Sequence, residues 1–349
     1  MKVTREKLKE LMATKLHKAG LTQEHADIVA DVLVHADARG YHSHGAMRVE
    51  YYSERINKGG TNCNPNFNFQ KTGPCTAIFD GDNAAGHVVA KLGMDEAIKM
   101  AKENGVAIVG MRRMGHSGAL SYFVQQAAEQ NLVALTLCQS DPMAVPYGGA
   151  EPYYGTNPIA FGAPGKNGEN IIIDMATTVQ AWGKVLDARS KNKPIEEGWA
   201  VDSNGQTTTD PFKVSSLLPI AGPKGYGLMM MVDILSGIML NLPFGNKVTS
   251  MYHDLTEDRN LGQLHIVIDP ECFTDLESFK ENIAQTMQDL NNIKPATGFD
   301  KVYYPGQRSG IREKKANEEG IDIVDSIYEY LVSDVIHNNA YDHKGAFAK

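Results

Sequence analysis

The chain has 349 residues, of which 42% are apolar and 22% are charged, so it can bury a large core and should form more than one structural unit. Its formal net charge of −8 argues against a nucleic-acid partner, because proteins that bind phosphate backbones usually carry basic surfaces. Four scattered cysteines, and an N-terminus without an apolar core, predict a cytoplasmic protein with reduced thiols and no export signal.

The first 72 residues are predicted to form a helical segment. Apolar residues recur at helical spacing between Leu8 and Leu16 and again between Ile28 and Leu33, and Gly40 should end the second helix. A third helix is expected from about His44. Residues 58–74, which are rich in Gly, Asn and Pro, mark the first domain boundary.

Residues 73–272 are predicted to form a mixed-sheet domain. Strand-like and helix-like stretches alternate in its first half, which is typical of α/β proteins. These stretches are, in chain order, residues 76–80, 88–104, 105–111, 117–130 and 132–138. The pair Asn204-Gly205 predicts a β-hairpin, so the sheet should be mixed rather than all parallel.

The rest of the domain should contain a helix at 225–241 and a strand at 264–269. The helix belongs to an apolar stretch of almost membrane-spanning length, but Asp233 and Pro243 interrupt it, so we expect a buried helix and no membrane partner. In residues 273–349, two or three amphipathic helices are expected to pack with the N-terminal segment.

Residues 41–52, YHSHGAMRVEYY, gather polar side chains around one glycine. If a helix begins near Ser43 or His44, then His44, Arg48 and Tyr52 follow at i, i+4 and i+8 and share one face. A guanidinium together with free N–H groups at a helix start can bind a carboxylate. The alternative is an ordinary solvated helix face.

His116 is the best candidate for a general base. It lies in the segment MGHSGAL directly after a predicted strand, where open α/β sheets bind their ligands. An ordinary imidazole pKa of about 6.5 suits proton abstraction at neutral pH. The alternative is a structural or merely exposed histidine.

Two further segments carry candidate polar residues. Asp141, in CQSDPM, could orient a histidine by accepting its ring N–H, or it could simply form the turn before Pro142. Lys224, in AGPKGYG, lies among glycines at a predicted helix start, which suits a phosphate. No standard nucleotide, metal or serine-hydrolase motif is present, and a glycine-rich helix start without a ligand is the alternative for Lys224.

Six segments carry a resemblance to known proteins: HSHGAMR (42–48), RMGHSGA (113–119), VPYGGAEPYYGTNPIAFGAP (145–164), IIIDMATT (171–178), GPKGYGL (222–228) and YYPGQR (303–308). In this order they resemble the malate/L-lactate dehydrogenase type 2 family nearly end to end. The resemblance implies a dehydrogenase that uses NAD, with NADP as the alternative. It also implies a three-layer mixed-sheet domain without the Rossmann fold, flanked by N- and C-terminal helices, in a homodimer or larger oligomer.

The resemblance also implies roles for individual residues. His116 would accept the proton, with Asp141 as a second catalytic residue. A small carboxylate substrate would contact Ser43, His44, Arg48 and Tyr52. The residues implied to line the NAD site are Ser140, Asp174, Met175, Ala176, Lys224, Gly225, Gly306, Gln307 and Arg308.

One departure from the family pattern bears on the substrate. Many relatives that act on simple 2-hydroxy acids have Asn-Ser or Asn-Thr where this chain has Gln139-Ser140-Asp141. Asp141 would lie near the second substituent of the substrate, and an acceptor there favours N–H donors, which malate and lactate lack. Two alternatives stay open: a dehydrogenase for malate, lactate, sulfolactate or a sugar acid, and a non-catalytic carboxylate-binding protein.

Overall fold

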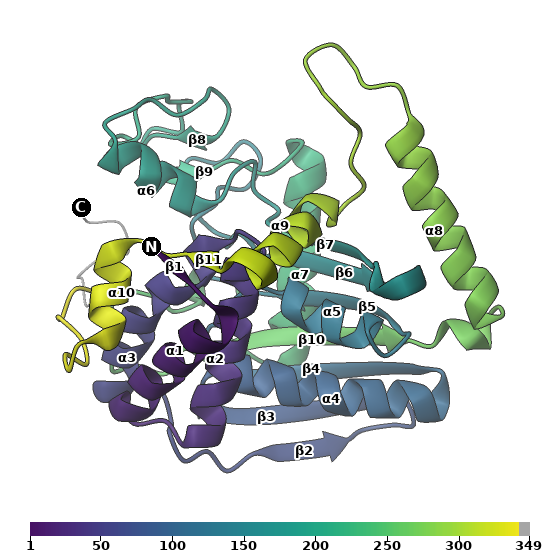
Figure 1. Ribbon diagram of the computed structural model, residues 1–349. Helices are drawn as coiled ribbons and strands as arrows, with labels where there is room; N and C mark the ends of the chain where they lie inside the picture. The colour runs from purple at the N-terminus through teal and green to yellow at the C-terminus, as the bar shows by residue number, and fades with distance from the viewer. Residues whose placement is uncertain (342–349) are drawn as a thin grey trace.

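A mixed sheet of seven strands lies at the centre of the computed structural model, which describes residues 1–341 (Figure 1). In chain order the strands are β2 (Asn68–Lys71), β3 (Thr76–Ala84), β4 (Val106–Met114), β5 (Val133–Cys138), β6 (Ile159–Ala163), β7 (Ile171–Met175) and β10 (Leu261–Ile268). Their order across the sheet is β2-β3-β4-β10-β5-β6-β7, and only β3 and β4 run parallel. The predicted α/β class with a mixed sheet is confirmed.

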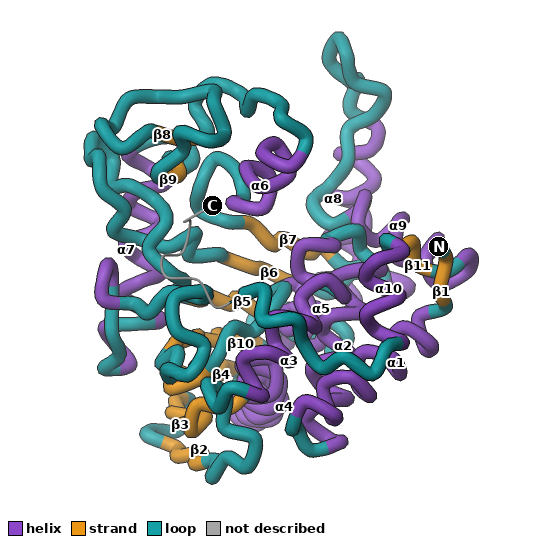
Figure 2. Tube along the Cα trace, turned by 90° about the vertical axis from the view of Figure 1, so that its left-hand side faces the viewer, coloured by secondary structure: helices purple, strands orange, loops and turns teal. Residues whose placement is uncertain are grey.

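Helices cover both faces of this sheet. Helices α4 (Gly86–Asn104) and α5 (Ser121–Ala128) pack on one face, and α7 (Pro223–Ser236) packs on the other (Figure 2). Successive side chains of β5 point to opposite faces of the sheet and so contribute to both helical layers. Ala134 belongs to the core under α4 and α5, whereas Leu137 packs with Val232 of α7. The predicted three-layer arrangement follows from this alternation.

The N-terminal helices form a further layer over α4 with a hydrophobic core of their own. Helices α1 (Arg5–Ala19) and α2 (Gln23–Ala38) each begin after a threonine whose hydroxyl accepts a backbone N–H of the first turn. Helix α3 (Val49–Asn57) packs on α1.

The C-terminal elements return to the N-terminal layer. Helix α9 (Gln307–Glu319) contacts α2, α10 (Asp325–Val332) contacts α1, and strand β1 (Lys2–Val3) pairs with β11 (Ile321–Asp322). Helix α8 (Leu276–Asn292) stands away from the body at the right of Figure 1. The division of the chain at residues 72 and 272 stays a prediction, and residues 342–349 of the third predicted segment lie outside the described residues.

A small lobe lies above the central sheet in Figure 1 and contains α6 (Trp182–Ser190), β8 (Ala200–Val201) and β9 (Ser216–Leu217). The expected turn at Gly205 is present, because its N–H donates to the carbonyl oxygen of Asp202 at 3.0 Å. The hairpin is not part of the central sheet, however, because β8 pairs with β9 instead. The central sheet is mixed because β3 and β4 run parallel whereas all its other neighbouring strands run antiparallel.

The third helix begins at Val49, so its predicted start near His44 is wrong. Residues 42–48 form two 3₁₀ turns separated by Gly45. The buried carboxylate of Asp37 explains the break, because it accepts the N–H of Ala46 at 2.6 Å and fills the space that a side chain at position 45 would need. His44 and Arg48 therefore do not share one helix face.

Two other predicted helices are shorter than expected. Helix α5 begins at Ser121 rather than residue 117, and α7 ends at Ser236, after which residues 238–240 form a 3₁₀ turn. None of the helices between residues 1 and 341 has the length and apolar character that a membrane span requires.

Candidate active site

His116 meets three of the side chains predicted from residues 41–52. The hydroxyl of Tyr52 lies 2.7 Å from Nδ1 of His116. The ring centroids of His44 and His116 are 5.7 Å apart. Arg48 is close enough to lower the pKa of His116. The structure thus brings the predicted base and the predicted carboxylate-binding residues together, although residues 42–48 are not an α-helix.

The position of His116 depends on a close approach between two backbones. Strand β4 ends at Met114, and the following residues run against the first turn of α4. A side chain on Gly86 would come within 2.0 Å of the carbonyl oxygen of Gly115, so only glycine fits at the start of α4. The next residue, His87, then packs edge-on against Tyr52, with ring centroids 4.9 Å apart.

The imidazoles of this cluster are neutral at pH 7. Burial is the largest effect that holds the pKa of His116 well below its ordinary value, and electrostatic interactions with His44 and with the cation of Arg48 lower it further. Burial lowers the pKa of His44 to about 4 and that of His87 to about 3. Burial raises the pKa of the Tyr52 hydroxyl, which therefore keeps its proton. The pKa of His116 is therefore lower than the ordinary imidazole value on which the choice of this histidine as a base was argued.

Arg48 is held by two neighbours. Its Nε donates to the carbonyl oxygen of Ser43 at 2.7 Å, and Nη1 donates to the hydroxyl of Tyr252. The hydroxyl of Ser43 lies 3.0 Å from Nδ1 of His44. Since a guanidinium has five N–H groups, Nη2 and one N–H of Nη1 stay available to bind an anion.

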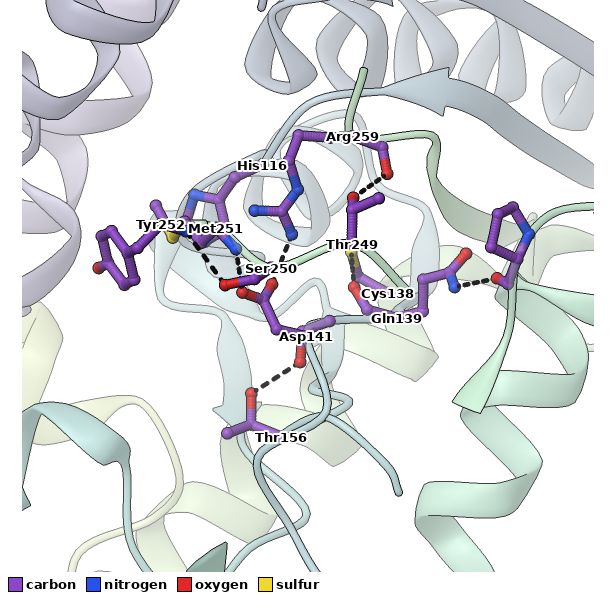
Figure 3. A network of polar contacts seen from close by, with 12 residues as sticks. His116, Cys138, Gln139, Asp141, Thr156, Thr249, Ser250, Met251, Tyr252 and Arg259 are labelled. Atoms are coloured by element: carbon purple, nitrogen blue, oxygen red, sulfur yellow. Dashed lines mark hydrogen bonds and ion pairs between the residues drawn. The ribbon is translucent and has the colours of Figure 1, made fainter. Parts of the chain in front are cut away.

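Asp141 does not orient a histidine. Its carboxylate pairs with the guanidinium of Arg259 and also accepts the backbone N–H of Met251 (Figure 3). Both side chains are buried, with 5% of Asp141 and 1% of Arg259 exposed. Figure 3 shows the guanidinium of Arg259 beside the ring of His116, and its charge also lowers the pKa of that histidine. The hydroxyl of Tyr52 occupies Nδ1 of His116 instead.

Three of the four segments predicted to line the NAD site are linked through Thr156, Thr177 and Ile220. Ser140, just after β5, bonds the hydroxyl of Thr156 at 3.2 Å. Thr177, just after the predicted Asp174-Met175-Ala176 turn, donates its N–H to Thr156 and accepts the N–H of Ile220. A side chain on Gly225 would lie 1.9 Å from the carbonyl oxygen of Ile220, so the start of α7 packs directly on this run, with Lys224 exposed beside it.

Asp174 also connects this region to the loop that carries His116. Its carboxylate accepts the N–H of Ser121 at 2.8 Å, at the start of α5 and five residues beyond His116. Burial raises the pKa of Asp174 to about 6. Asp174 is therefore a helix cap that holds the end of β7 against the His116 loop.

The fourth segment, Gly306-Gln307-Arg308, lies at the start of α9. A side chain on Gly306 would come within 2.7 Å of the carbonyl oxygen of Ile172, so α9 starts against β7, close in sequence to Asp174. An open pocket of about 640 Å³ borders this helix start. Its cationic lining residues are Lys301, Arg308 and Arg312. No residue of the His116 cluster lines this pocket.

Tyr252 and Arg259 could not be recognised as site residues from the sequence. Both belong to the irregular segment between α7 and β10, in which no periodicity or motif marks a site. Arg259 would be expected at the surface, since arginine is rarely buried without a partner. Only the fold brings Asp141 to it from more than a hundred positions away.

Comparisons with known proteins identify relatives over nearly the whole length of the chain. The Malate/L-lactate dehydrogenase family matches residues 3–332. The chain is 63% identical over 349 residues to a ureidoglycolate dehydrogenase (NAD(+)) of Escherichia coli, with full coverage of both chains. It is 38% identical over 333 residues to a malate/(S)-sulfolactate dehydrogenase of Methanothermus fervidus, which covers 95% of this chain and 96% of that protein.

Among solved structures, a sulfolactate dehydrogenase from Methanocaldococcus jannaschii has a TM-score of 0.88 and 37% identity over 95% of each chain. A malate dehydrogenase from Entamoeba histolytica has a TM-score of 0.90 and 29% identity, covering 95% of this chain and 96% of that one. The fold and these matches define an oxidoreductase that acts on a CH–OH group. The chain belongs to the malate/L-lactate dehydrogenase family.

Proposed function

We propose that this protein oxidises ureidoglycolate to oxalurate with NAD, as a step of allantoin and purine degradation. The observation that carries the proposal is the cluster in which the hydroxyl of Tyr52 contacts His116 and the nearby charge of Arg48 helps to keep the pKa of that histidine low. The full-length identity of 63% to a ureidoglycolate dehydrogenase (NAD(+)) supports the choice of substrate and cofactor. Ureidoglycolate has the two groups that this cluster suits, a carboxylate and a hydroxyl on the adjacent carbon.

In the proposed reaction, Arg48 binds the substrate carboxylate through its free N–H groups and thereby fixes the distance from the hydroxyl to His116. Nδ1–H of His116 donates to Tyr52, so Nε2 carries the lone pair that takes the hydroxyl proton. Bound NAD would accept the hydride that leaves the same carbon. Tyr52 is then a positioning residue for the base rather than a direct substrate contact.

The residues of the second region fit a dinucleotide. Glycines at 225 and 306 let two helix starts come close to neighbouring backbone, and such helix starts present free N–H groups to phosphates. Lys224 and Arg308 add positive charge. We propose that NAD is held by these residues and by Ser140 and the turn at 174–176, with Asp174 acting through the cap on α5.

For Asp141 we propose a different role from direct contact with the substrate. Both of its oxygens are already engaged, one by Arg259 and the other by the N–H of Met251. Asp141 therefore fixes the segment that carries Tyr252, the neighbour of Arg48. In this arrangement Asp141 does not serve as the acceptor for N–H groups of the substrate, because both of its oxygens already have partners.

We further propose that the protein works in the cytoplasm as a homodimer or a larger homo-oligomer. Helix α7 and the turn that follows it expose Met230, Met231, Ile234, Ile238 and Met239. A contiguous apolar surface of this kind is typical of a subunit interface. Its position on α7 would bring a second subunit close to the helix start that carries Lys224. All four cysteines are free thiols, as expected in a reducing compartment.

The deciding experiment is the absorbance at the nicotinamide band after purified protein is mixed with NAD and ureidoglycolate. Malate, lactate, sulfolactate and a sugar acid should each be tested with NAD and with NADP. The proposal requires the highest kcat/KM for ureidoglycolate with NAD. A higher value for malate or sulfolactate would assign the activity of the 38% identical relative instead. Failure of both cofactors to bind, measured by thermal shift, would leave a non-catalytic carboxylate-binding protein.

A further inference from the structure

The hydroxyl of Tyr252 accepts a hydrogen bond from Nη1 of Arg48. A guanidinium can only donate, so the phenol oxygen is the acceptor and the phenol proton is left over. Within residues 1–341, no other group takes part in a hydrogen bond with this hydroxyl. Tyr252 therefore places an O–H donor directly beside the free N–H groups of Arg48.

The backbone of Tyr252 is fixed from one side by the buried ion pair. Asp141, which pairs with Arg259, accepts the N–H of Met251, and the N–H of Tyr252 donates to the hydroxyl of Ser250 at 3.2 Å. Figure 3 shows this backbone next to the ion pair and the ring of Tyr252 pointing away from it. The anchoring thus sets where the Tyr252 ring projects.

The ring of Tyr252 is fixed from the other side by the end of the described chain. The ring of Tyr341 stacks on it with centroids 6.3 Å apart and an interplanar angle of 22°. Tyr51 contacts both rings edge-on, at 5.6 Å from Tyr252 and 5.8 Å from Tyr341. The rings of Tyr51 and Tyr341 thus fix the ring of Tyr252 so that its hydroxyl stays on Arg48.

Residues 333–341, here called the C-terminal segment, are tied to the N-terminal layer along their length. The buried ammonium of Lys15 donates to the carbonyl oxygens of Ser333 at 2.6 Å and Val335 at 2.7 Å. The side chain of Asn338 donates to Glu50 at 2.6 Å. The N–H of Tyr341 donates to Glu54 at 3.1 Å. Glu50 and Glu54 both belong to α3, the helix that follows Arg48 directly.

We propose that Tyr252 is a second carboxylate-binding residue, which donates its hydroxyl proton to one oxygen of the substrate carboxylate while Arg48 binds the other, and that Tyr341 is the positioning residue that holds Tyr252 there. The inference rests on the proposed function, because it takes the substrate to be a 2-hydroxy acid. Arg48 supplies the charge, and Tyr252 supplies a second, directional donor. The C-terminal segment, residues 333–341, thereby helps to form the substrate site.

The first test removes only the hydroxyl. Tyr252→Phe should raise KM for ureidoglycolate by about 10- to 100-fold, the loss of one hydrogen bond to a charged group, while kcat changes much less. The affinity for NAD, measured by fluorescence titration, should stay unchanged. The matched control is Tyr328→Phe, because Tyr328 is a half-buried tyrosine of α10 without a side-chain hydrogen bond in the described structure. An unchanged KM in Tyr252→Phe would overturn the proposal.

A binding measurement separates this inference from the proposed function. Oxamate has a carboxylate next to an amide carbonyl, and calorimetry with oxamate needs no turnover. Oxamate should bind Tyr252→Phe more weakly than wild type, whether or not ureidoglycolate proves to be the substrate. If wild-type protein oxidises none of the hydroxy acids but this difference is found, the proposed function fails and the inference stands. Equal oxamate affinities, or no oxamate binding to wild type, refute the inference.

The second test addresses Tyr341. Tyr341→Phe keeps the stacked ring and should have the KM of wild type, whereas Tyr341→Leu removes the ring and should raise KM. Because Tyr341 acts through Tyr252, combining Tyr341→Leu with Tyr252→Phe should add little to the effect of Tyr252→Phe alone. If Tyr341 had only a structural role, Tyr341→Leu would lower the melting temperature, but its KM would equal that of Tyr341→Phe. Equal KM values for the two Tyr341 variants would exclude the positioning role.

Discussion

The hydroxyl of Tyr52 lies 2.7 Å from Nδ1 of His116, where many histidine bases have a carboxylate. A carboxylate would raise the pKa of the imidazole, but a neutral phenol fixes the ring without adding charge. His116 thus keeps a low pKa and a defined orientation at the same time. The reaction can begin with the base already deprotonated at neutral pH.

Substitution of Tyr52 by Phe should release the ring of His116. We expect kcat to fall by about 10- to 100-fold, the range found when the partner that orients a histidine is lost. KM should change less, because Arg48 is intact. Steady-state kinetics with Tyr328→Phe as the control will measure both effects. A kcat equal to that of wild type would mean that Tyr52 does not orient the base.

Removal of the base itself should be more damaging. His116→Ala should lower kcat by about 10² to 10⁴, the usual contribution of general base catalysis. NAD binding, followed by fluorescence, should be retained, because no cofactor residue is changed. Arg48→Met should instead act mainly on KM, with some loss of kcat if the substrate is misplaced. Near wild-type turnover of His116→Ala at neutral pH would remove this histidine from the mechanism.

The pH dependence should reflect the lowered pKa of His116. Activity requires the neutral imidazole and is lost as the pH falls through its pKa, so the acid limb of kcat/KM should lie well below pH 6.5. A bound carboxylate brings negative charge to the cluster and raises this pKa, so the acid limb of kcat should lie at higher pH. Profiles of both parameters test this order. An acid limb of kcat/KM at 6.5 or above would contradict it.

The ion pair between Asp141 and Arg259 should matter for stability as well as for the site. Arg259→Met leaves the carboxylate buried without its cation, which should lower the free energy of unfolding by about 3–5 kcal/mol. The exposed pair Lys314–Glu169, with an N–O distance of 3.2 Å, is the matched comparison. Lys314→Met should cost less than about 1 kcal/mol. Urea denaturation of the two variants should separate them clearly.

Asp233 should make stability depend on pH. Burial raises its pKa to about 6, against the opposing effect of the N–H of Gly245. The folded state therefore favours the protonated carboxyl, and this contribution is complete below the unfolded pKa of about 4 and is lost as the pH rises through about 6.

Asn cannot titrate but can still accept the N–H of Gly245. The stability of Asp233→Asn relative to wild type should therefore increase by about 2–3 kcal/mol between pH 4 and 7. Urea denaturation at several pH values measures the difference. A difference that does not vary with pH would show that Asp233 titrates normally in the folded protein.

Local patterns predicted much of this molecule. The alternation of strand-like and helix-like stretches was sufficient to predict α4, β4, β5 and the α/β class, because the apolar residues of these elements lie in the cores on the central sheet. His116 could be found because it follows a strand directly. The conformation of residues 42–48 could not be predicted in the same way. Asp37 imposes two tight turns there through its contact with residues 45 and 46, and the spacing of apolar residues does not show such a contact.

Long-range partners could not be predicted from local patterns. Tyr52 on His116, Arg259 on Asp141 and Tyr252 on Arg48 are separated by 64, 118 and 204 positions in the chain. The lowered pKa of His116 has the same origin, because burial and neighbouring charges are properties of the folded chain. The family resemblance implied a set of site residues, but the hydrogen bonds and ion pairs between their side chains could not be predicted from it.

The pairing of β1 with β11 joins residues 2–3 to residues 321–322. During synthesis, the first helices leave the ribosome long before the strand and helices that complete their packing exist. Contacts between such distant parts of a chain form slowly. The N-terminal layer must therefore wait, partly uncovered, until residues 321–322 have been synthesised. A ribosome that stops early would release a chain with an exposed apolar surface, which makes it a natural target for chaperones and proteases.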